Sequence, residues 1–139
     1  MFSASTTNKI YRISAWYDLI VTWPFAIPIT LSVFWASVLA PVNVMLGFEP
    51  LPALGTHAVL FGNFFGSLVV IWALARLYLN DTRLAIFDGI GRLLFSVAMI
   101  NAIMMGITPL IWGFLIPEIT FGVVQLLGLT KFFARKSEQ

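Results

Sequence analysis

The last apolar stretch of this 139-residue sequence contains a single carboxylate, Glu118, among apolar neighbours. Glu118 follows Pro109 by nine residues and precedes Lys131 by thirteen, so a helical rise of about 1.5 Å per residue would place it near the middle of a bilayer. Inserting an ionisable side chain at that depth costs roughly 2.5–3.5 kcal/mol, and such a residue should face protein or water and have a partner. Glu118 is therefore the first candidate for chemistry.

Pro117 stands directly before this carboxylate. Proline lacks a backbone N–H and its ring crowds the preceding turn, so the carbonyl of Gly113 loses its usual partner. A helix break beside an intramembrane charge is how many membrane proteins build a binding or ion site from exposed backbone. Gly122 and Gln125 continue one small or polar face of the helix from Glu118.

The stretch before it carries Asp88, Arg92 and Ser96 at successive i,i+4 positions, so they share one helix face. Asp88 and Arg92 can pair along their own helix, and an antiparallel neighbour would bring Glu118 within reach of Arg92. We hypothesise that Asp88, Arg92, Glu118 and Gln125 form an intramembrane polar cluster that binds a ligand or ion. The alternative is that they only join helices, through hydrogen bonds that average about 0.6 kcal/mol.

Other polar side chains inside the apolar stretches are secondary candidates. For Asn63, Ser67 and Asn101 we favour interhelical hydrogen bonding over a functional role. His57, the only histidine, could titrate near neutral pH, although a single histidine at a helix end is more often interfacial or capping. The sequence has no cysteine and no second histidine, so we expect neither a metal site nor a cofactor.

The elements that must position these residues follow from composition. Hydrophobic residues make up 60% of the chain and charged residues 10%, against about 25% charged in a typical soluble domain. Four stretches are long enough to cross a hydrocarbon core of about 30 Å. We predict an all-α integral membrane protein, a four-transmembrane-helix bundle in a single domain over residues 1–139. The expected spans are 16–39, 57–78, 84–105 and 109–132, with an apolar outer loop over 40–56.

Local sequence refines this plan. Pro24 and Pro28 predict a kink or a late start of the regular helix in the first span. The connection over 106–108 is so short that the third and fourth spans must be antiparallel neighbours.

Small residues at spacing four mark the faces where helices can approach closely. The second span has Gly62 and Gly66, and the first span has Ser32, Ala36 and Ala40. We expect the two stripes to meet, either within one chain or between copies in a homo-oligomer.

Lysine and arginine precede the first span, flank the second loop and follow the fourth span, whereas the first and third loops have none. The positive-inside rule therefore predicts cytoplasmic N- and C-termini, and we expect residence in a bacterial inner (plasma) membrane. The positive charges are dispersed along the chain, so we expect no nucleic-acid partner. The partners that we expect are membrane lipids, a homo-oligomer or a partner membrane protein.

The sequence lacks the motifs of most enzyme classes. There is no G-x-S-x-G nucleophile motif and no phosphate-binding loop. We therefore predict a binding or accessory component that uses helix faces and the intramembrane cluster. Two alternatives stay open: a small oligomeric transporter or channel with a site at Glu118 and Arg92, and an intramembrane acid–base enzyme that acts on lipid. Four helices leave little room for a pathway, so transport would require an oligomer.

Overall fold

The computed structural model describes the backbone of residues 4–136 and the side chains of residues 5–128. The chain is 86% helical, and the described residues form no strand. The α-helices are α1 (Ala4–Thr22), α2 (Pro28–Phe34), α3 (Ala40–Met45), α4 (Thr56–Leu79), α5 (Ala85–Met104) and α6 (Trp112–Lys136).

Four helical segments among the described residues are long and apolar enough to cross a membrane. They cover Pro28–Met45, Thr56–Leu79, Thr82–Met104 and Pro109–Gly128. The prediction of an all-α chain with four helices able to span a membrane is confirmed. The predicted polar tail from Lys131 onward lies outside the residues whose side chains are described.

Contacts within the chain define two compact units. One consists of residues 1–14 and 80–139, and the other of residues 15–79. Helix α1 contributes to both, because the boundary falls between Ser14 and Ala15. The single domain over 1–139 stays a prediction, and each unit is described by itself below.

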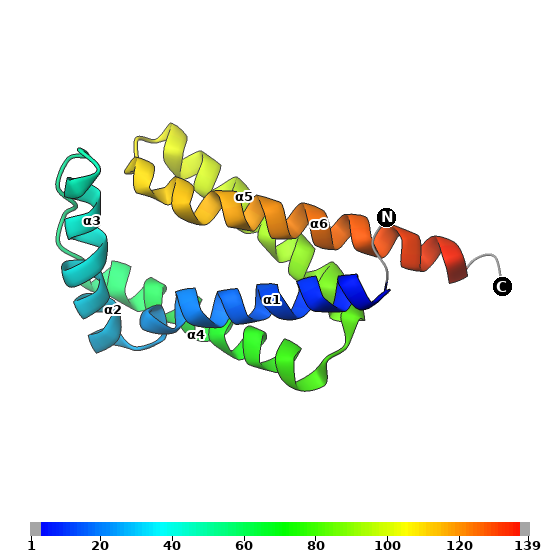
Figure 1. The fold of residues 1–139 in the computed structure, drawn as a ribbon. Helices are drawn as coiled ribbons and strands as arrows, with labels where there is room; N and C mark the ends of the chain where they lie inside the picture. The colour runs from blue at the N-terminus through cyan, green and yellow to red at the C-terminus, as the bar shows by residue number, and fades with distance from the viewer. Residues whose placement is uncertain (1–3, 137–139) are drawn as a thin grey trace. The chain divides into compact units, whose positions relative to one another are not determined.

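In the unit of residues 15–79, the chain breaks where Pro24 and Pro28 predicted a kink or a late start of the regular helix. Helix α1 ends at Thr22, a 3₁₀ turn covers Trp23–Ala26, and Ile27 is extended at φ −127° and ψ 135°. A residue before proline avoids the helical region, and Pro28 is accepted as the first residue of the next helix. The chain changes direction between α1 and α2 (Figure 1). The candidate span therefore begins at Pro28, later than the expected 16–39.

The same helical segment continues past Leu39, where the outer loop was expected to begin. A π-helical turn over Trp35–Leu39 separates α2 from α3, and the Ala40 N–H bonds to the Trp35 carbonyl, five residues back. A proline ring clashes with the carbonyl four residues earlier, and the wider turn just before Pro41 relieves that clash. The helix thus absorbs Pro41 and ends at Met45.

The loop between α3 and α4 is tied back to the helical segment before it. The buried Asn43 side chain donates to the Glu49 carbonyl at 2.6 Å, and the Trp35 indole donates to the Pro52 carbonyl at 3.1 Å. Gly47 takes a left-handed conformation at φ +80°, which suits a residue without Cβ. These contacts give an apolar loop a defined path.

In the other unit, α5 and α6 form a helical hairpin and lie side by side (Figure 1). The chain reverses through Gly106 at φ +86°, and a 3₁₀ turn over Pro109–Ile111 leads into α6. The N-terminal part of α1 packs on the hairpin, where Tyr11 and Ala85 are both 1% exposed.

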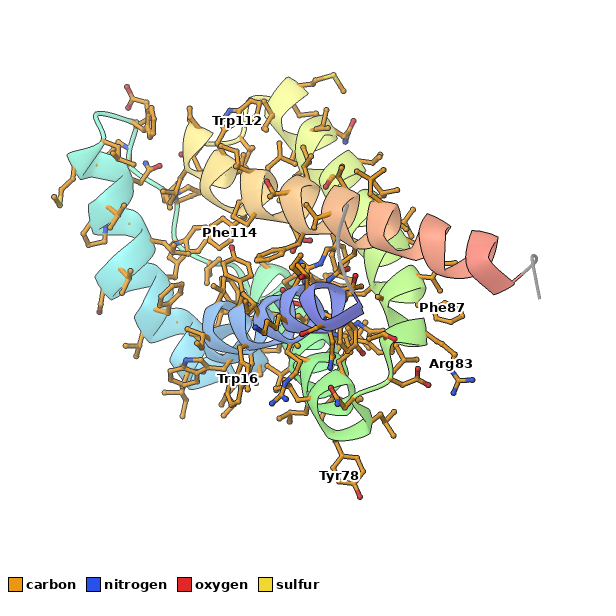
Figure 2. All side chains as sticks on the ribbon, turned by 45° about the vertical axis from the view of Figure 1, so that its right-hand side comes forward. Trp16, Tyr78, Arg83, Phe87, Trp112 and Phe114 are labelled. Carbon is orange, nitrogen blue, oxygen red and sulfur yellow. The ribbon has the colours of Figure 1, made fainter. Side chains whose placement is uncertain are left out.

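Large apolar side chains cover the outer faces of the helices. Tyr78 on α4 is 90% exposed and Phe87 on α5 is 64% exposed, and both point away from the helices that carry them (Figure 2). Extensive exposed apolar surface is typical of helices that contact lipid or another protein.

Candidate functional site

The candidate site is a charged cluster on the α5–α6 hairpin. On α5, Asp88 and Arg92 lie one turn apart, and Arg92 Nε donates to Asp88 Oδ2 at 3.1 Å. Both side chains are buried, with exposed fractions of 4% and 3%. One turn further, the Ser96 hydroxyl donates to the Arg92 carbonyl at 2.8 Å. The i,i+4 spacing seen in the sequence therefore produces one buried polar face.

Helix α6 supplies the second carboxylate. Arg92 Nη1 donates to Glu118 Oε2 at 2.9 Å, and the Glu118 side chain is 18% exposed. The guanidinium carbon of Arg92 lies 5.2 Å from the centre of the Phe121 ring, within the range of a cation–π interaction. Asp88, Arg92 and Glu118 are thus joined in one network, and Glu118 is its most exposed member.

Two residues of α6 shape this contact. A Cβ on Gly122 would lie 3.3 Å from Arg92 Cβ, so the glycine allows the two helices to approach at the level of the guanidinium. The predicted helix break at Pro117 is wrong: α6 runs without interruption from Trp112 to Lys136, with Pro117 inside it directly before Glu118. Because proline cannot donate, the Gly113 carbonyl loses its bond from residue 117 at this point of the helix.

The network places two carboxylates on one arginine. The Arg92 guanidinium bonds to both Asp88 and Glu118, in a segment apolar enough to span a membrane. A neutral pair would already satisfy Arg92, and each further ionisable group adds roughly 2.5–3.5 kcal/mol of insertion cost. Carboxylate oxygens accept hydrogen bonds, so the chemistry of the cluster suits a hydrogen-bond donor or a positively charged group.

The structure gives Gln125 a different partner from the expected one. Gln125 Nε2 donates to the Ser14 hydroxyl oxygen at 2.7 Å, and both residues are buried. The Ser14 hydroxyl in turn donates to the Tyr11 carbonyl at 2.9 Å. Sequence reasoning misses Ser14, because the polar residues 1–15 resemble a surface helix or a frayed tail. The signal was the row Tyr11, Ser14 and Asp18, which repeats at helical spacing.

A second ion pair lies in the unit of residues 15–79. Arg76 on α4 donates to Asp18 on α1, and these side chains are 0% and 7% exposed. From the sequence, Arg76 is only a charge flanking a loop. The available signal was Asp18, the only acidic residue of its apolar stretch, which needed a buried partner.

The secondary polar candidates have structural contacts. Asn63 Nδ2 donates to the Phe25 carbonyl at 2.8 Å, and the Ser67 hydroxyl donates to the Ala26 carbonyl at 3.2 Å. Both carbonyls belong to the 3₁₀ turn, so α4 supplies donors to the backbone that the helix break frees.

The remaining two candidates lie at exposed positions. Asn101 contacts the Met105 sulfur at 3.5 Å on the exposed face of α5, and His57 is exposed in the first turn of α4. Neither lies in the charged cluster.

Within this chain the glycines of α4 contact residues outside the predicted stripe of the first span, and a contact between copies stays a prediction. A Cβ on Gly66 would lie 2.6 Å from the Ala26 nitrogen, and one on Gly62 would lie 2.9 Å from a methyl group of Leu31. Ser32 and Ala36 are exposed and Ala40 is half-buried, so this stripe is not buried against α4. The first candidate span begins at Pro28. Gly66 therefore lies against the 3₁₀ turn before this span, and Gly62 lies against its first turn, rather than against the predicted stripe.

Among the described residues, no three His, Cys, Asp or Glu side chains are grouped closely enough to hold a metal ion. The chain matches no protein-family model, no curated protein and no solved structure. Its class is therefore defined by its own features, as an all-helical chain with four helices that can span a membrane and a charged cluster on one hairpin.

Proposed function

We propose that this chain is a multi-pass membrane protein that acts as a binding component, with Glu118 as the group that meets its ligand or partner. The observation behind the proposal is the arrangement at Arg92, which is bonded to Asp88 and Glu118 at once. Asp88 already pairs with Arg92 on the same helix, so Glu118 brings a second ionisable carboxylate to this guanidinium, at an added cost of insertion.

The exposure of the three side chains supports the same assignment. Asp88 and Arg92 are almost fully buried, and Glu118 retains 18% exposure on α6. A group offering a positive charge or N–H and O–H donors could therefore reach Glu118 while Arg92 stays held by Asp88. Such a group could come from a lipid headgroup, a small ligand or the transmembrane helix of a partner.

Site-specific photocrosslinking tests the proposal. A benzophenone amino acid is placed at Ile119, which is 38% exposed and adjacent to Glu118, and a control is placed at Ile71 on α4, which is 65% exposed. In native membranes we expect a discrete adduct from position 119 that falls several-fold in the E118Q background, while adducts from position 71 do not change.

The mass of the adduct distinguishes lipid, small ligand and protein. An adduct at position 119 that is equally strong in E118Q, or no adduct there at all, would refute the proposal. E118Q must first unfold at the same denaturant concentration as the wild type, so that a loss of the adduct reports binding.

The same arrangement of two carboxylates on Arg92 favours a second candidate, a small oligomeric transporter or channel with its site at Glu118 and Arg92. Four helices offer little room for a pathway, so this function requires several copies. Mass measurement in lipid nanodiscs gives the oligomeric state, and a strict monomer counts against transport. An oligomer that carries a cation flux in liposomes, with the flux lost in E118Q, supports transport.

The proposed function includes a location, a bacterial inner membrane with both termini in the cytoplasm. The support is the distribution of lysine and arginine around the spans. Because the natural chain has no cysteine, single-cysteine variants give clean labelling. In intact cells we expect Glu49→Cys to react with an impermeant maleimide and Asp81→Cys to react only after lysis. The opposite pattern would reverse the topology.

A further inference from the structure

Helix α1 carries polar side chains on the side that packs against the rest of the protein. Ser14, Asp18 and Thr22 are all buried. Ser14 accepts a hydrogen bond from Gln125. Asp18 forms an ion pair with Arg76. The three positions repeat at intervals of four residues, so they define one side of the helix.

The opposite side of α1 is exposed and mostly apolar. From residue 9 onward its exposed positions, here called the outer stripe, are Lys9, Arg12, Ile13, Trp16 and Ile20. At 3.6 residues per turn they fall within about 100° of one another around the helix axis. All five belong to one continuous helix, so their relative placement follows from helical geometry alone.

The apolar part of the outer stripe indicates a partner other than water. Trp16 and Ile20 are 51% and 65% exposed, and exposed apolar surface marks a contact with lipid or protein. Among the described residues, the four candidate spans do not include α1. A tryptophan favours the level between headgroups and acyl chains, where its ring contacts apolar chains and its N–H meets polar groups. Trp16 therefore suits the interface of a lipid leaflet.

The N-terminal end of the outer stripe is positively charged. Lys9 and Arg12 are exposed and three residues apart, and neither forms an ion pair with another described residue. Asp18 is the only acidic residue of α1, and it lies on the buried side. The outer stripe therefore has no carboxylate of its own, and its ammonium and guanidinium groups suit a phosphate.

The order of groups along α1 matches the order of groups in a phospholipid. At about 1.5 Å per residue, Trp16 lies about 6 Å beyond Arg12 along the axis and Ile20 about 12 Å beyond it. The hydrocarbon of one leaflet is about 15 Å deep. A lipid that lies along α1 with its phosphate at Arg12 would place its acyl chains on Trp16 and Ile20.

We propose that the outer stripe of α1 is a binding site for an anionic phospholipid, whose phosphate is bound by the two basic residues and whose acyl chains contact the apolar ones. The site shares no residue with the charged cluster of the α5–α6 hairpin and attracts the opposite charge, so it is independent of the proposed function. Each basic residue near an anionic lipid surface strengthens binding by about fivefold.

Native mass spectrometry of the full chain tests the lipid preference, with phosphatidylglycerol and phosphatidylcholine of identical acyl chains as probes. We expect the wild type to bind phosphatidylglycerol more tightly than phosphatidylcholine. Arg12→Gln should bind phosphatidylglycerol about fivefold less tightly, and the double variant with Lys9→Gln about 25-fold less tightly. Arg83→Gln is the matched control, because it also removes one exposed positive charge, and it should bind as the wild type does.

Two results of this experiment would overturn the proposal. One is equal affinity of the wild type for the two lipids, and the other is an equal loss in Arg12→Gln and Arg83→Gln. Glycerol phosphate, which carries the charge without acyl chains, should not displace the lipid at equal concentration. Displacement would show that the apolar part of the outer stripe does not contribute, and it would also overturn the proposal.

Photocrosslinking identifies the occupant without altering either charge. A benzophenone amino acid is placed at Ile13, which is 59% exposed, and a control at Ile71 on α4, which is 65% exposed. In a bilayer with equal amounts of the two lipids, we expect adducts at position 13 to be enriched in phosphatidylglycerol and adducts at position 71 to match the bilayer. The same composition at both positions, or an adduct at position 13 with a second copy of the chain in place of lipid, would overturn the proposal.

Discussion

Replacing Gly66 by alanine should destabilise the unit of residues 15–79, because α4 passes against the backbone of the helix break at this position. The new Cβ would lie 2.6 Å from both the Ala26 nitrogen and Phe25 Cβ. Neither atom belongs to the free end of a flexible side chain, so a helix or the 3₁₀ turn must shift. Overpacking of this kind costs about 1–3 kcal/mol.

Two smaller terms modify this value. Alanine is the better helix former by roughly 1 kcal/mol, which offsets part of the cost. A displaced turn also weakens the bonds that Asn63 and Ser67 donate to it, each about 0.6 kcal/mol. We therefore expect a net loss of about 1–3 kcal/mol.

Gly91 and Gly62 provide matched controls. A Cβ on Gly91 meets no atom within 4 Å, so Gly91→Ala should be neutral or stabilising by up to about 1 kcal/mol. A Cβ on Gly62 meets only the end of the Leu31 side chain at 2.9 Å, so Gly62→Ala should fall between the other two. Reversible unfolding in lipid–detergent micelles by added dodecyl sulfate gives the three free energies. If Gly66→Ala is as stable as Gly91→Ala, the close approach does not exist.

Three further predictions concern the polar contacts. In the same unfolding assay, Asp18→Asn should cost about 3–5 kcal/mol because it leaves a buried guanidinium without its carboxylate, whereas Glu118→Gln should cost less than about 1 kcal/mol. Asn63→Leu should lose about 1–2 kcal/mol, because a carbonyl of the helix break loses its donor. A hydrogen bond from the Arg83 side chain lowers the pKa of Asp81 below its ordinary value. The contact between Asp81 and Arg83 therefore stabilises the fold at neutral pH, and this stabilisation is lost as the pH falls through the pKa of Asp81 in the folded state. NMR titration should show that low midpoint and its rise in Arg83→Gln.

The sequence was sufficient to predict the contact between α5 and α6. Asp88 and Arg92 share a face through the i,i+4 spacing, and the short connection after α5 forces α6 to run beside it. Those two constraints leave little freedom for Glu118, and the structure joins Arg92 Nη1 to Glu118 Oε2 at 2.9 Å. Its function as a site stays a prediction.

The partner of Gln125 could not be found in the same way. Gln125 lies on the same face of α6 as Glu118, but seven residues place it about 10 Å further along the helix axis. At that level its neighbour is Ser14 of α1 rather than Arg92. Helical periodicity specifies a face, and the packing of a third helix decides which polar group meets it.

The break between α1 and α2 shows a second limit. Pro24 and Pro28 indicated a disturbance, but the sequence could not say whether one span would bend or start late. The donors that decide the outcome lie on α4, where Asn63 and Ser67 bond to the Phe25 and Ala26 carbonyls. These pairs are 38 and 41 residues apart, and no local pattern connects them.

Among the described residues, two buried arginines bear on the role of Glu118. Arg76 is paired with Asp18, and this neutral pair joins α1 to α4. Arg92 already has such a partner in Asp88, one turn away on its own helix. Glu118, the member that α6 contributes, is therefore a second carboxylate on an arginine that already has one. If Glu118→Gln proved as destabilising as Asp18→Asn, this distinction would fail, and the cluster would be a helix joint rather than a binding site.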